Sequence, residues 1–222
     1  MGEARPLSER AVVVFDFDGT LADTKAGIIS TATTVLSQWG VPAADLARVG
    51  DIIGPPFPQA FEQVFGLSHD AAVEVTRRYR DIYMHLGIEA WPAFPGVADL
   101  LRDLRAAGRR LAVASSKRTN LVRRGLDDNQ IASLFDIVCA KGSDDESTKT
   151  DAIVRSMREL GAGPADTVMV GDRFHDVEAA AACGVSCIGV LYGQTADRAE
   201  LEDAGAVAVA QTVDELRALL LG

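Results

Sequence analysis

The stretch VVVFDFDGTLADT, residues 12–24, decides the fold, because an apolar run typical of a buried strand leads directly into acidic residues. Side chains of a strand alternate between its two faces, so Asp16 and Asp18 are expected on one side, opposite Phe17. Two adjacent carboxylates repel each other and are costly to bury unless a cation meets them. A hard cation such as Mg²⁺, bound through oxygen atoms, would resolve the conflict. Gly19 permits a tight turn whose backbone amides can face an anion.

The C-terminal two thirds of the chain alternates short apolar runs with helical patterns. Amphipathic or glycine-terminated helical segments separate the runs, which is typical of βαβ units. The sequence therefore predicts an α/β fold with a doubly wound, Rossmann-like and mostly parallel sheet. In such sheets, ligands bind at the carboxyl ends of the strands. The predicted strands after the first lie at 109–115, 134–140, 166–172, 185–193 and 206–210.

Residues 24–91 interrupt this alternation with helical patterns alone. The sequence predicts an inserted all-helical cap domain at 23–91, between core-domain segments 1–22 and 92–222. An insert that leaves from the end of the first strand is expected to cover the site as a lid. Phe57 and Phe61 in this insert are expected to pack in its core, with contact to a nucleobase or apolar substrate group as the alternative.

Composition limits the classes of partner. The net charge of −10 argues against nucleic acid and anionic membranes, which both need a basic surface. No apolar run approaches the roughly 20 residues of a membrane span, and the first ten residues are too polar for a signal peptide. The three cysteines lie in apolar surroundings without a CxxC pair, as expected for reduced core thiols. These features favour a cytoplasmic protein.

Hydroxyl residues follow the second predicted strand, in the sequence VASSK at 113–117. The hydroxyl groups and amides of Ser115 and Ser116 could hold phosphate oxygens at the same edge of the sheet. The alternative is that a hydroxyl caps the helix that begins near Arg118 or Thr119.

Further charged residues lie beside the end of the predicted strand at 166–172. Asp172 follows it, and Asp176 is one helical turn later, so both could face one site, although Asp172 could instead cap the helix. Lys149 opens the preceding helix and is the favoured source of positive charge. The alternatives are a solvated Lys149, or a cation supplied by Lys117 or Lys141.

The order of these motifs resembles the haloacid dehalogenase superfamily, in particular its branch of phosphoglycolate phosphatase-like hydrolases with a small helical cap. The resemblance rests on DFDGT at 16–20, VASSK at 113–117, Lys149 and GDRFHD at 171–176, and extends over roughly residues 11–220. It implies a Mg²⁺-dependent phosphatase that hydrolyses a small phosphorylated metabolite through an aspartyl-phosphate.

The resemblance also implies a role for each motif residue. Asp16 would be the nucleophile and Asp18 the general acid and base. Mg²⁺ would be held by Asp16, the Asp18 backbone carbonyl and Asp172, with Asp176 orienting the metal-bound water. The phosphoryl oxygens would be bound by a set of polar groups that comprises Gly19, Ser115, Ser116 and Lys149.

Several alternatives remain open at this point. Asp18 argues against a dehalogenase, but sugar-phosphate mutases of the same superfamily keep that residue, and Thr20 favours a phosphatase over a mutase. A 5′-nucleotidase acting on nucleoside monophosphates is equally compatible with the motifs. A phosphoacceptor signalling domain is disfavoured, because it would carry no helical insert after the first strand. A monomer is expected, with a dimer as the alternative.

Overall fold

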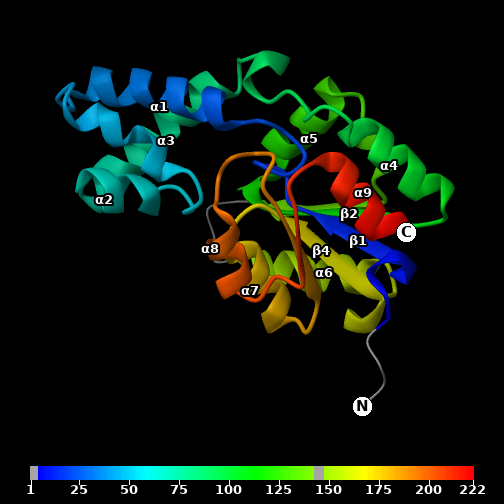
Figure 1. Ribbon diagram of the computed structural model, residues 1–222. Helices are drawn as coiled ribbons and strands as arrows, with labels where there is room; N and C mark the ends of the chain where they lie inside the picture. Colours follow the sequence, from blue (N-terminus) through cyan, green and yellow to red (C-terminus); the bar gives the residue numbers. More distant parts are fainter. Residues whose placement is uncertain (1–4, 143–147) are drawn as a thin grey trace. The chain divides into compact units, whose positions relative to one another are not determined.

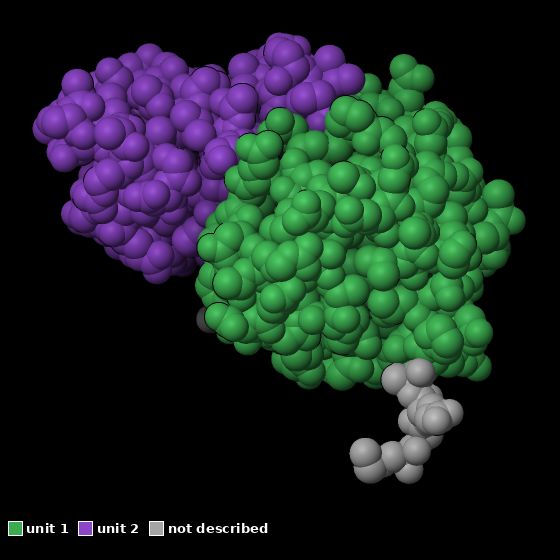
Figure 2. Space-filling view, viewed as in Figure 1, with its two compact units in different colours: residues 1–23, 93–222 green, residues 24–92 purple. Residues whose placement is uncertain are grey.

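The computed structural model of the chain describes residues 5–142 and 148–222. The chain divides into two compact units, coloured separately in Figure 2. The first, called the sheet unit, comprises Met1–Asp23 and Ala93–Gly222. The second, called the helical unit, comprises Thr24–Pro92.

A six-stranded sheet in the order β3-β2-β1-β4-β5-β6 organises the sheet unit, and every neighbouring pair in it is parallel. This confirms the doubly wound α/β fold. Register is fixed at the centre, where Val12 lies opposite Arg110 on one side and Thr167 on the other. The strands are β1 (Val12–Phe15), β2 (Arg110–Arg118), β3 (Ile137–Lys141), β4 (Thr167–Gly171), β5 (Ser186–Val190) and β6 (Ala208–Ala210).

Helices cover both faces of this sheet (Figure 1). They are α4 (Val97–Ala106), α5 (Thr119–Asp128), α6 (Lys149–Glu159), α7 (Phe174–Ala182), α8 (Arg198–Asp203) and α9 (Val213–Leu221). Figure 1 shows α4, α5 and α9 on one face and α6 and α7 on the other. Because both faces are covered, all four residues of β1 are buried, which explains its uninterrupted apolar sequence.

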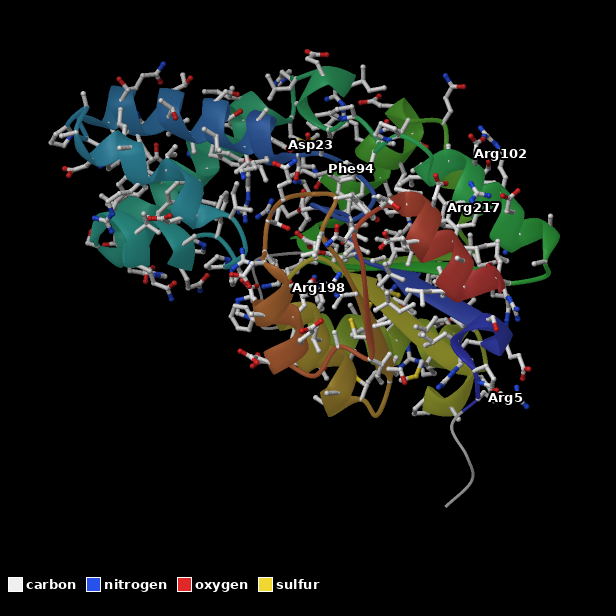
Figure 3. All side chains as sticks on the ribbon, in the orientation of Figure 1. Arg5, Asp23, Phe94, Arg102, Arg198 and Arg217 are labelled. Atoms are coloured by element: carbon white, nitrogen blue, oxygen red, sulfur yellow. The ribbon has the colours of Figure 1, made fainter. Side chains whose placement is uncertain are left out.

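Local signals in the sequence account for most of these boundaries. Thr212 caps α9 by accepting a hydrogen bond from the Glu215 N–H, as its hydroxyl residue type favours. Arg217 of α9, labelled in Figure 3, reaches α4 and pairs with Asp103. Helix α8 was not predicted, because a single buried leucine, Leu201, gives too weak a pattern.

The helical unit contains no strand, and all of its residues are described. Its helices are α1 (Lys25–Trp39), α2 (Gln59–Phe65) and α3 (His69–Tyr83), with 3₁₀ segments at Asp45–Ile52 and Ile88–Ala90. Helix α1 is followed by its C-cap Gly40, which has the left-handed φ of 95° that glycine adopts without strain.

Aromatic residues form the centre of the helical unit. The ring centroids of Phe57 and Phe61 are 4.6 Å apart, and Phe57 also meets Tyr79 edge-on at 5.0 Å. Tyr83 continues the cluster from Tyr79 to Trp91. Phe61 is fully buried, which confirms its expected core-packing role, whereas Phe57 packs against it and is half-buried.

Across the described part of the chain, none of the helices combines the length and the apolar character that crossing a membrane requires.

Candidate active site

Strand β1 is the topological switch point of the sheet, because its neighbours β2 and β4 lie on opposite sides of it. Asp16 directly follows β1, Asp172 directly follows β4, and Ser115 stands in β2 two residues beyond Val113, the partner of Phe15. Ligands of doubly wound sheets bind at such a point. The strand order thus brings candidate site residues that are far apart in the sequence to the same edge of the sheet.

Three buried carboxylates meet at this edge. One oxygen from each of Asp16, Asp172 and Asp176 lies within 4.8 Å of the others. The Oδ1 atom of Asp16 is buried and has no hydrogen-bond partner among the described residues. A buried oxygen of this kind is costly unless something binds it, and three carboxylates are suitable ligands for a hard cation. The residues therefore fit a divalent metal ion.

Lys149 supplies positive charge to the same cluster. Its Nζ lies 2.8 Å from Asp16 Oδ2 and also donates a hydrogen bond to Asp176 Oδ1. Burial by itself would lower the pKa of Lys149, but the charges of Asp16 and Asp176 more than offset this and raise it. The alternative of a solvated lysine is wrong, because the Lys149 side chain is 12% exposed.

Two carboxylates of the cluster have raised pKa values. Burial, together with the charges of Asp176 and Asp18, raises the pKa of Asp16 to about 6, against the opposing effect of Lys149. Burial, followed by the charges of Asp176 and Asp16, also raises the pKa of Asp172 well above its usual range. A single lysine therefore does not neutralise the cluster, and a bound cation would favour its ionised form.

Gly19 lets the turn after β1 approach Asp172 closely. Its φ is 73°, and a Cβ at this position would lie 2.0 Å from Asp172 Oδ2. The Gly19 N–H donates to the Ala22 carbonyl and is therefore not available to a ligand. Gly19 instead contributes by lacking a side chain that would clash with Asp172. Thr20 is fully buried, and its Oγ1 lies 3.5 Å from Asp172 Oδ1.

Asp18 stands apart from the three-carboxylate cluster. Its Oδ1 accepts a hydrogen bond from Lys117 Nζ at 2.7 Å. From the sequence, Lys117 is considered only as an alternative to Lys149 as the source of positive charge. In the structure the two lysines pair with different aspartates. The register of β2 shifts after Ser115, so strand periodicity gave no signal for this pairing.

The serine pair lies within β2 rather than after it, since this strand extends to Arg118 with a register shift after Ser115. Ser115 is buried and its Oγ accepts a hydrogen bond from the Lys117 N–H at 3.3 Å, while Ser116 is half-buried. The alternative that a serine caps the next helix is wrong, because the N-cap of α5 is Arg118.

Asp176, and not Asp172, takes part in capping the N-terminus of α7. Its N-cap is Arg173, and the Arg173 N–H donates to Asp176 Oδ2 at 3.1 Å. Asp172 is therefore not the cap. Sequence reasoning missed Thr195, whose hydroxyl lies 3.5 Å from the Asp172 carbonyl oxygen, and Tyr192, whose hydroxyl donates to the Thr20 carbonyl at 2.8 Å.

The sequence is similar to those of known proteins. The family model described as "Haloacid dehalogenase-like hydrolase" matches residues 13–190. Among curated proteins, the tyrosine-protein kinase PtkA of Mycobacterium tuberculosis is 36% identical over 217 residues, which cover 97% of this chain and 74% of PtkA. A 5′-nucleotidase of Pseudomonas aeruginosa is 33% identical, with 82% of both chains covered. A phosphoglycolate phosphatase of Pseudomonas putida is 31% identical, with 95% of this chain and 79% of the relative covered.

Solved structures agree with the sequence relatives. A predicted phosphatase from Clostridium acetobutylicum superposes with a TM-score of 0.88 at 32% identity, covering 96% of this chain and 98% of that one. The fold, the motif order and the family match lead to one assignment: the chain belongs to the haloacid dehalogenase-like hydrolases, in the branch related to phosphoglycolate phosphatases, and is a hydrolase of the phosphatase class.

Proposed function

We propose that the chain is a Mg²⁺-dependent phosphatase that hydrolyses a small phosphomonoester through an aspartyl-phosphate on Asp16. The observation that carries this proposal is the environment of the Asp16 carboxylate. One oxygen contacts Lys149, and the other is buried, unpartnered among the described residues and part of the three-carboxylate cluster. A carboxylate held in this way is oriented for attack on phosphorus.

Mg²⁺ would be held by the carboxylates of Asp16 and Asp172 and by the backbone carbonyl of Asp18, whose own carboxylate is engaged by Lys117. Asp176 would orient water bound to the metal. When bound, the ion would supply positive charge that neutralises the phosphoryl oxygens.

The chain's own carboxylates would carry out the bond changes. Asp16 attacks phosphorus, the ester P–O bond breaks, and Asp18 gives a proton to the departing alcohol. Asp18 then takes a proton from a water molecule that attacks the aspartyl-phosphate, which returns Asp16 as a carboxylate and releases phosphate. General acid and base catalysis of this kind contributes about 10²- to 10⁴-fold.

The phosphoryl group would be bound by the Ser115 hydroxyl, the Ser116 amide and Lys149. The Ser115 Oγ already accepts a hydrogen bond from the Lys117 N–H, so its own proton is available to a phosphoryl oxygen. Gly19 would contribute by giving the turn its close approach to Asp172.

The substrate is proposed as a small soluble phosphomonoester, with phosphoglycolate and nucleoside 5′-monophosphates as the first candidates. Relatives named phosphoglycolate phosphatase and 5′-nucleotidase support these two classes. A sugar-phosphate mutase is the alternative that keeps the same nucleophile. The three free cysteines support a cytoplasmic location, and a monomer that binds neither nucleic acid nor membranes is proposed.

A second candidate is phosphoryl transfer to a tyrosine hydroxyl. It is favoured by the 36% identity to PtkA, named a tyrosine-protein kinase, over 97% of this chain. In that reaction a protein hydroxyl would replace water as the acceptor from the nucleophile.

Phosphate release from phosphoglycolate, nucleoside 5′-monophosphates and hexose phosphates tests these candidates. The proposal predicts release with Mg²⁺, loss of release with EDTA, and loss in Asp16→Asn. Conversion of a hexose 1-phosphate to its 6-phosphate with little phosphate released would support the mutase. Label transfer from ATP to a tyrosine peptide, without release from any ester, would support the kinase. Full activity of Asp16→Asn would contradict the proposed nucleophile.

A further inference from the structure

Asp18, the general acid and base of the proposed reaction, pairs with a different lysine from the one that contacts Asp16. Lys117 Nζ donates to Asp18 Oδ1 at 2.7 Å, while Lys149 serves Asp16 and Asp176. The Lys117 side chain is 9% exposed and that of Asp18 is 27% exposed. The contact is therefore largely shielded from water, unlike the exposed ion pairs on the surface of the molecule.

The backbone on both sides of this contact is fixed. The Lys117 N–H is tied to the Ser115 hydroxyl, and the Lys117 Nζ lies 5.9 Å from the centre of the Phe17 ring. The Phe17 ring in turn packs against Gly125 of α5, where a Cβ would lie 2.3 Å from Phe17 Cζ. Phe17, the residue before Asp18, thus lies between the Lys117 ammonium group and α5.

We propose that Lys117 is a positioning residue that holds Asp18 by one carboxylate oxygen, so that both proton transfers of the proposed reaction pass through the other. The inference rests on the proposed phosphatase function and adds a specific part to it.

The chemistry follows from the hydrogen-bonding capacity of a carboxyl group. When protonated, Asp18 has one acceptor oxygen and one hydroxyl donor. An ammonium group has only donors, so Oδ1 accepts from Lys117 and the proton resides on Oδ2. That proton goes to the leaving alcohol in the first step, and Oδ2 takes one from the attacking water in the second. Lys117 itself neither gains nor loses a proton.

A lysine that bound the phosphoryl group directly would have a different effect. Removing it would weaken substrate binding and slow phosphoryl transfer for every leaving group. Removing a lysine that acts through Asp18 should spare esters whose leaving group departs without a proton. Phosphoglycolate and p-nitrophenyl phosphate differ in this respect, because p-nitrophenolate is a stable anion.

The test compares Lys117→Met and Lys117→Arg with the wild type. For phosphoglycolate, Lys117→Met is expected to lower kcat by about 10- to 100-fold, within the range of a misplaced acid–base group, and to change KM by less than about twofold. Lys117→Arg keeps a donor and should recover most of kcat. The burst rate of p-nitrophenol from p-nitrophenyl phosphate should stay within about threefold of wild type in Lys117→Met, because that step needs no proton.

A double-mutant cycle with Asp18→Asn shows whether Lys117 acts through Asp18. Lys117→Met is expected to cause no further loss of kcat in the Asp18→Asn background. Lys141→Met, at the end of the neighbouring strand β3, is the matched control for loss of a lysine and should behave like wild type.

The other outcomes overturn the inference. Equal losses in kcat and in the burst, a raised KM with unchanged kcat, or losses that multiply with Asp18→Asn would each show that Lys117 does not act through Asp18. Unchanged kcat in Lys117→Met would overturn this inference but not the proposed function, since the wild type would still be a phosphatase. A wild-type protein that releases no phosphate would overturn the proposed function together with this inference.

Discussion

The sheet unit differs from the helical unit in its buried cluster of charged residues. In the sheet unit, Asp16, Asp172 and Asp176 are each less than 10% exposed, and Lys149 pairs with Asp16 and Asp176. In the helical unit, Glu74 pairs with Arg77 and Arg78 along the exposed side of α3, while the interior is aromatic. Exposed pairs are screened by solvent, whereas buried charges persist only with a partner. Burying charged groups is costly, and the chain does so at the carboxylate cluster of the sheet unit, so its chemistry is expected there.

The largest effect is expected from removing the lysine of the buried cluster. Lys149→Met leaves Asp16 and Asp176 without their cation and should lower the free energy of unfolding by about 3–5 kcal/mol. Saturating Mg²⁺ should restore part of this loss, because it supplies positive charge to the same carboxylates. Urea unfolding with and without Mg²⁺ measures both effects, with Lys141→Met as control. A loss of less than 1 kcal/mol would contradict the role of Lys149 in the cluster.

The helical unit should respond to the loss of an aromatic ring instead. Phe61 is fully buried, and Phe61→Ala should lower the free energy of unfolding by about 3–5 kcal/mol by leaving a cavity. Mg²⁺ affinity should stay unchanged, since the metal ligands lie in the sheet unit. Calorimetry and Mg²⁺ titration check the two parts. A tenfold loss of Mg²⁺ affinity in Phe61→Ala would contradict the expectation that the helical unit does not affect metal binding.

Alanine substitutions at Gly19 and Gly40 distinguish the effect of backbone strain from the effect of a steric clash at the site. Gly19 and Gly40 both have positive φ, but a Cβ meets Asp172 only at Gly19 and meets nothing within 4 Å at Gly40. Both alanine variants should lose about 1 kcal/mol of stability. Only Gly19→Ala should also weaken Mg²⁺ binding, by about 10- to 100-fold, as expected when a carboxylate ligand is displaced. Isothermal titration shows the difference, and equal Mg²⁺ affinity in both variants would contradict it.

The smallest effect is the pH dependence of metal binding. The pKa of Asp16 is raised to about 6, so this carboxyl holds its proton below that pH and Mg²⁺ must displace it there. Mg²⁺ affinity should therefore rise with pH as Asp16 loses its proton near pH 6, by at most about tenfold per pH unit for this one proton, and the raised pKa of Asp172 acts in the same direction. Without metal, the same shift makes stability fall as pH rises from about 4 to about 6. Mg²⁺ affinity that is flat across this range would contradict the raised pKa.

Much of the sheet unit could be predicted from its sequence. Because β1 is covered on both faces, its sequence is uniformly apolar, and the parallel order brings Asp16, Ser115 and Asp172 to one edge. The partnership of Lys117 with Asp18 could not be predicted in the same way. It depends on a register shift after Ser115 and on the reach of a long side chain, and neither leaves a periodic signal. Helix α8 was missed for a related reason, since it buries only Leu201.

The central claim is that Asp16 becomes phosphorylated during turnover. The most direct measurement is mass spectrometry of the protein after acid quenching within the first turnover, with p-nitrophenyl phosphate and Mg²⁺. The account predicts one added phosphoryl group on the peptide that contains Asp16, lost on dilution into substrate-free buffer and absent from Asp16→Asn. Phosphate release without any modified Asp16, or with a phosphoryl group on another residue, would contradict it.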